Sequence, residues 1–95
     1  MGKNPNVIFR ELYAKAKKRH ELATNADGTT QDPIAIMEKE DHCYYTVYSK
    51  VVKSFILEGY SEQKADKHIM QWVDNDILTI RMRNGWRYVG FYEDL

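Results

Sequence analysis

The dipeptide Asn84-Gly85 is the feature of this chain that most constrains its fold. It lies inside residues 78–92, where apolar and polar side chains alternate on both sides of it. Asn and Gly both tolerate the positive φ that a type I′ turn requires, and this turn matches the twist of two antiparallel strands. The sequence therefore predicts a β-hairpin with strands over 78–83 and 86–92.

A two-residue turn also fixes which residues face each other across the hairpin. One face of the hairpin would be mostly aliphatic and include Phe91, whereas the other would place arginines opposite aromatic rings. We expect the aliphatic face to join the core, and the arginine–aromatic face to stay in water or to be covered by a partner. The predicted pairs are Arg83 with Trp86, Arg81 with Tyr88, Thr79 with Gly90, Met82 with Arg87, Ile80 with Val89, and Leu78 with Phe91.

Size and composition indicate a single domain over residues 1–95. The chain is 43% hydrophobic and 29% charged, which is typical of a folded protein in water. It has no apolar run long enough to span a membrane and no N-terminal stretch that indicates a signal peptide. Cys43 is the single cysteine, so we expect a buried thiol in a cytoplasmic protein, with a reactive thiol as the alternative.

The charges are balanced overall but unevenly placed. There are 14 basic and 14 acidic residues, and this neutrality counts against nucleic-acid binding, which usually depends on positive potential. Residues 3–20 hold six bases and one acid, whereas residues 21–41 hold six acids and one base. The two blocks either neutralise each other across a contact between helices, which we favour, or form separate contact surfaces.

Apolar residues recur at helical spacing in four segments before the hairpin. The segment Tyr44–Val52 is also rich in β-branched and aromatic residues that suit a strand, but its spacing and length favour a helix. The predicted helices cover about residues 6–20, 33–40, 42–58 and 61–74. Their expected N-caps are Asn6, Asp32, Asp41 and Ser61.

Two helices joined by a tight turn and followed by a hairpin resemble a winged helix-turn-helix domain. The resemblance covers about residues 33–95 and implies an α+β fold, in which N-terminal helices precede a helix-turn-helix and a C-terminal two-stranded β-hairpin. The residues that carry it are Gly59, Tyr60 and Ser61 in the turn, Ala65 and Ile69 on the inward side of the second helix, and Asn84 and Gly85 at the tip of the wing.

In this fold the second helix usually enters the major groove of DNA, and the wing touches the backbone or the minor groove. Residues 60–95 differ from a typical DNA-binding surface in two ways. They hold six acids and five bases, so they are not strongly basic, and the predicted helix over 61–74 lacks arginine. The resemblance implies that DNA is contacted by Lys64, Lys67, His68 and Gln71 from the helix, and by Arg81, Arg83 and Arg87 from the wing.

Trp86 and Tyr88, on the arginine–aromatic face, are further candidates for contact with a partner. Arginine and large aromatic residues often contribute most of the binding energy at interfaces. Trp86 directly follows the turn, so we expect it to be partly exposed. The alternative is that it packs against the N-terminal helix through Phe9 or Tyr13.

The sequence contains no phosphate-binding loop, no paired-cysteine spacing and no nucleophile motif, so we expect no enzyme activity, no metal and no cofactor. Two functions remain open. The first is a winged-helix protein that binds DNA in transcription or replication control, with a size typical of phage or mobile-element accessory proteins. The second is a protein-binding module that inhibits or adapts a host enzyme through the arginine–aromatic face. The order of elements favours the first function, net neutrality favours the second, and a homodimer is compatible with either.

Overall fold

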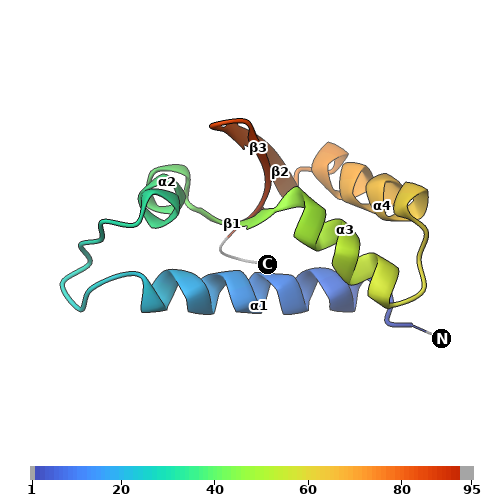
Figure 1. The fold of residues 1–95 in the computed structure, drawn as a ribbon, viewed down its shortest axis with the longest axis horizontal. Coiled ribbons are helices and arrows are strands. Elements are labelled where there is room, and N and C mark those ends of the chain that lie inside the picture. The colour runs from blue at the N-terminus through green and yellow to red at the C-terminus, as the bar shows by residue number, and fades with distance from the viewer. Residues whose placement is uncertain (1, 93–95) are drawn as a thin grey trace.

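The computed structural model describes residues 2–92, which form four helices and a three-stranded antiparallel sheet (Figure 1). The α+β class expected from the sequence is therefore confirmed. In chain order the elements are α1 (Pro5–Leu22), α2 (Pro33–Asp41), β1 (Cys43–Val47), α3 (Tyr48–Leu57), α4 (Glu62–Asp74), β2 (Leu78–Arg83) and β3 (Trp86–Tyr92).

The strand β1 corrects the sequence analysis, which predicted one helix over 42–58 and a sheet of only two strands. Cys43 and Tyr45 are buried at alternate positions, which is the period of a strand and not of a helix. β1 pairs antiparallel with β3, so the sheet order is β1-β3-β2. The segment that forms β1 is rich in aromatic and β-branched residues, and it gains backbone hydrogen bonds by pairing with β3. This pairing makes it a strand, although its apolar residues have helical spacing.

The hairpin forms as the sequence predicts. Asn84 has a φ of 50° and Gly85 a φ of 81°, and a type I′ turn requires positive φ at both positions. All six predicted residue pairs of β2 and β3 are present. The predicted register is therefore confirmed. It could be predicted because it depends only on the two-residue turn and not on distant contacts.

Side-chain caps start three of the helices. α1 begins after Asn4 and not after the predicted Asn6, because the Asn4 side chain accepts a hydrogen bond of 3.0 Å from the amide three residues later. Asp32 and Ser61 cap α2 and α4, as predicted. Asp41 caps no helix but ends α2, since the next residue turns the chain with a left-handed conformation and leads into β1.

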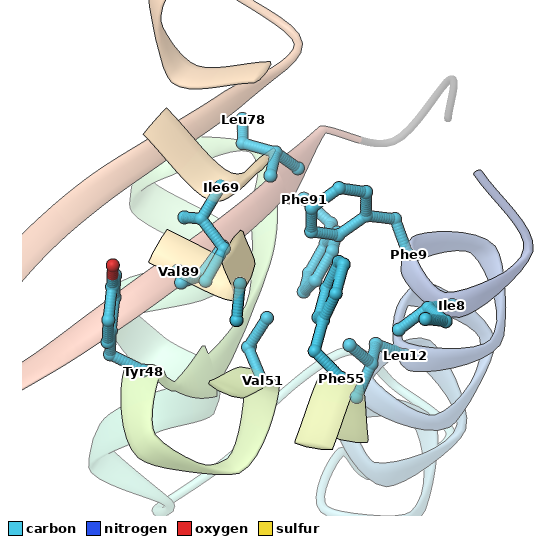
Figure 2. Close-up of a cluster of buried hydrophobic side chains, with 11 residues drawn as sticks. Ile8, Phe9, Leu12, Tyr48, Val51, Phe55, Ile69, Leu78, Val89 and Phe91 are labelled. Carbon is cyan, nitrogen blue, oxygen red and sulfur yellow. The ribbon is translucent and has the colours of Figure 1, made fainter. Parts of the chain in front are cut away.

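The main core lies on one face of the sheet, which packs against α1, α3 and α4 (Figure 2). Phe9 from α1, Phe55 from α3 and Phe91 from β3 are all fully buried. The ring centroid of Phe9 lies 5.2 Å from that of Phe55 and 6.4 Å from that of Phe91. Ile69 from α4 and Leu78 from β2 lie beside these rings. The prediction that the aliphatic face of the hairpin joins the core is confirmed for Leu78, Ile80, Val89 and Phe91. It is wrong for Met82 near the turn, which is exposed.

The opposite face of the sheet packs against α2. Met37 from α2 forms a second buried cluster with Cys43 and Tyr45 from β1, and Tyr88 and Tyr92 from β3 pack against it. The expectation that this face stays in water or is covered by a partner is therefore wrong for the tyrosines near β1. The Cys43 thiol is buried, as predicted, and burial raises its pKa.

A buried carboxylate on α2 joins three elements. The side chain of Glu38 is fully buried and forms an ion pair with the Arg19 guanidinium of α1. His20 Nδ1 lies 2.9 Å from the carboxylate oxygen Oε1 of Glu38. The backbone amide of Tyr45 in β1 donates a 2.7 Å hydrogen bond to Oε2, the oxygen that also pairs with Arg19. Arg19 belongs to the basic block of the sequence and Glu38 to the acidic block, so the favoured interpretation of neutralisation across a helix contact holds for this pair.

Replacing Glu38 by Ala should lower the free energy of unfolding by on the order of 3 kcal/mol, because Arg19 and the Tyr45 amide lose a buried acceptor. The matched control is Glu40→Ala, since Glu40 is exposed on the same helix. The control should change stability by less than about 0.5 kcal/mol. Urea unfolding followed by circular dichroism measures both variants, and equal losses would contradict the role given to Glu38.

Replacing Gly85 by Val should cost about 1–3 kcal/mol, because a β-branched residue is strained at positive φ. A Cβ at this position would meet no other atom within 4 Å, so the loss reports backbone strain and not a clash. Gly85→Asn is the control, because Asn tolerates the left-handed region much better than Val. If thermal melts show no difference between the Val and Asn variants, the turn assignment fails.

Candidate functional site

The outer side of α4 exposes three of the residues that the sequence analysis singled out. Lys64, Lys67 and Gln71 are all exposed, whereas Ala65 and Ile69 on the other side of the helix are fully buried. We call these three exposed residues the α4 face. They combine two cations with an amide group that both donates and accepts hydrogen bonds.

His68 does not belong to the α4 face, contrary to the sequence analysis. It is half-buried and stacks on Phe55, with the ring centroids 5.9 Å apart and an angle of 16° between the ring planes. The Tyr60 ring meets it edge-on at 5.6 Å. His68 follows Ala65 by three residues, which places it at the border of the buried stripe, where the rings of α3 and the turn are within reach.

The tip of the hairpin carries a second exposed group. Trp86 is 58% exposed and Met82 is 61% exposed. Arg83 is half-buried and is paired to Trp86 across the two strands. We call Met82, Arg83 and Trp86 the hairpin tip. In Figure 1 the hairpin extends away from α1, so the tip lies at the side of the molecule opposite that helix.

The expected exposure of Trp86 is confirmed, and its alternative packing against α1 is wrong. The contact with α1 is made by the other tryptophan, Trp72 of α4, whose ring centroid lies 4.2 Å from that of Phe9. Trp72 is partly buried and packs against the main core. One tryptophan is therefore structural, and the other is available to a partner.

Two other predicted site residues on the hairpin have partners inside the molecule. Arg81 forms an ion pair with Asp41 at the end of α2, and this hydrogen bond raises the pKa of its guanidinium. Asp41 also accepts a 2.8 Å hydrogen bond from the Tyr45 hydroxyl. Tyr88 meets the Tyr45 ring edge-on, with centroids 6.2 Å apart. Arg81 therefore helps to attach the hairpin to α2, and Tyr88 packs on the β1 residue Tyr45.

Arg87 connects the hairpin to the helix pair. Its guanidinium carbon lies 3.8 Å from the centroid of the Tyr48 ring, at the start of α3. The Tyr48 hydroxyl in turn donates a 2.7 Å hydrogen bond to Asp66 on α4. Burial, and to a smaller extent this hydrogen bond, raise the pKa of Tyr48 to about 12.

The Arg87–Tyr48–Asp66 chain links the hairpin to α4 through the first residue of α3. Sequence reasoning missed Tyr48 and Asp66, because their contact depends on where β1 ends and α3 begins. The acidic Asp66 could have been noticed on the same helix as the predicted DNA contacts, but nothing local indicated its tyrosine partner. The arrangement offers the α4 face and the hairpin tip as two exposed surfaces held in a defined relation.

No protein-family model, curated protein or solved structure matches this chain. Within residues 2–92, no helix has both the length and the apolar character needed to cross a membrane. The same residues contain no group of three or more His, Cys, Asp and Glu side chains placed to hold a metal ion. The functional interpretation therefore rests on the α4 face and the hairpin tip.

Proposed function

We propose that this chain is a winged-helix protein that binds duplex DNA, acting in the cytoplasm in transcription or replication control. The observation that carries the proposal is that α4 exposes two lysines and a glutamine, and that the Arg87–Tyr48–Asp66 chain links the hairpin to this helix. The order of a strand, two helices joined by a tight turn, and two further strands supports the winged-helix assignment.

The exposed residues suit different parts of a duplex. An α-helix fits the major groove, and the amide of Gln71 has the donor and acceptor that adenine recognition needs. Lys64 and Lys67 at the same surface suit phosphates, which position a protein without reading sequence. Arg83 at the hairpin tip suits the neighbouring backbone. His68 and Arg81 are assigned no DNA contact, because partners inside the molecule hold them.

Replacing Lys64 and Lys67 together by Ala should weaken duplex binding at low salt. It should also reduce the salt dependence of the affinity by about one unit of slope for each lost phosphate contact. The control is Lys17→Ala with Lys18→Ala, which removes the same charge from the exposed side of α1. Fluorescence anisotropy with a labelled duplex at several salt concentrations measures both effects.

The control variant should retain most of the affinity and the wild-type slope. Equal losses in the two double variants would show that only net charge matters and would remove the α4 face from the proposal. Failure of the wild-type protein to bind any duplex at low salt would end the DNA-binding proposal altogether.

A different observation favours a second function, that of a protein-binding module that inhibits or adapts a host enzyme. Trp86 and Met82 at the hairpin tip are both more than half exposed, although large apolar side chains gain most from burial. Exposed tryptophan beside arginine is typical of residues that dominate binding energy at protein interfaces. The zero net charge of the chain is also more typical of a protein that binds another protein than of a protein that binds DNA.

Replacing Trp86 by Ala should abolish partner binding, whether the partner is DNA or protein, and should leave the melting temperature nearly unchanged because the side chain is exposed. Leu22→Ala is the control, since Leu22 is an 80% exposed apolar residue at the far end of α1. Affinity capture from lysate, with and without nuclease, separates the two partner classes. A large loss of stability with retained binding would make Trp86 a structural residue and exclude it as an anchor.

A further inference from the structure

A groove of about 660 Å³ lies between α1, the start of α2, β1 and α3. Its apolar lining includes Leu12 and Ala16 from α1, Ile34 from α2, Val47 from β1 and Leu57 from α3. Leu57 is 74% exposed at the end of α3, so its side chain is available to a ligand in the groove. A mainly apolar groove of this volume falls in the range of sites for small molecules.

Positive charge surrounds this apolar lining. Lys15 and Arg19 from α1 and Lys50 and Lys53 from α3 line the groove, together with one acid, Asp32. The Asp32 carboxylate accepts hydrogen bonds from the first turn of α2, and Arg19 is paired with the buried carboxylate of α2. The three lysines are exposed, and within residues 2–92 none of them forms an ion pair. These three lysines can therefore pair with an anionic group of a ligand in the groove.

We propose that this groove binds a small amphipathic anion. The apolar body of the ligand lies on the aliphatic lining, and its carboxylate or phosphate lies among Lys15, Lys50 and Lys53. The walls are preformed, because the aromatic core joins α1 to α3 and the Glu38 contacts join α1 to α2 and β1. Tyr88 of β3 also lines the groove, but no lining residue belongs to α4 or to the hairpin tip, so this site shares no residue with the two surfaces proposed to bind DNA.

The test is an NMR titration of the ¹⁵N-labelled full chain with sodium decanoate, below the concentration at which decanoate forms micelles. Saturable shifts are expected at amides of the groove, from α1, β1 and α3. Two matched probes separate the contributions to binding. 1-Decanol keeps the apolar chain without the charge, and acetate keeps the charge without the chain. Both should bind at least about tenfold more weakly than decanoate.

Replacing Lys50 and Lys53 together by Gln should weaken decanoate binding by about tenfold, since two partly exposed charge contacts are lost. The control is Lys17→Gln with Lys18→Gln, which removes the same charge from α1 outside the groove and should not change the affinity. Circular dichroism establishes that both double variants are folded. Leu57→Ser, at an exposed position, should also weaken binding because it removes apolar contact at the rim.

Several results would overturn the proposal. These are no saturable binding of decanoate, equal affinity for 1-decanol, equal losses in the two lysine double variants, or shifts outside the groove. Shifts of the groove amides with an acidic peptide or a DNA duplex, but not with decanoate, would also overturn it and assign the groove to a macromolecule.

Discussion

The buried carboxylate of Glu38 is the interaction on which the arrangement of the other elements depends. A carboxylate removed from water is costly unless charged and hydrogen-bonding partners replace the solvent. Here the partners come from two other elements, with Arg19 and His20 on α1 and the backbone amide of Tyr45 on β1. The requirement to satisfy one group therefore brings together α1, α2 and β1. With β1 held in place, β3 of the hairpin can pair with it, and the sheet has three strands.

The parts of the fold that depend on local chemistry could be predicted from the sequence. The register of the hairpin follows from Asn84-Gly85, and the start of α4 follows from Ser61, whose side chain accepts a hydrogen bond from the Lys64 amide. The strand β1 could not be predicted in this way. Its five residues have helical spacing when read with the following helix, and only the exposed edge of β3 makes them a strand.

The same distinction between local chemistry and distant contacts applies to the residues of the candidate site. Helical periodicity correctly places Lys64, Lys67 and Gln71 on the exposed side of α4, because the buried side is marked by small and aliphatic residues. The contacts of His68 with Phe55 and of Arg81 with Asp41 could not be predicted, since each partner comes from another element of the chain. The same is true of the contact between Arg87 and Tyr48, which requires β1 to end next to the hairpin.

The central claim is that α4 and the hairpin tip together form a surface that binds duplex DNA. The most direct test is a ¹H–¹⁵N NMR titration of the full chain with a mixed-sequence duplex at low salt. The account predicts shifts that are largest at the amides of α4 between residues 63 and 71 and at the hairpin tip around residues 82–87. Shifts confined to α1 and α3, or no shifts at any ratio of duplex to protein, would contradict it.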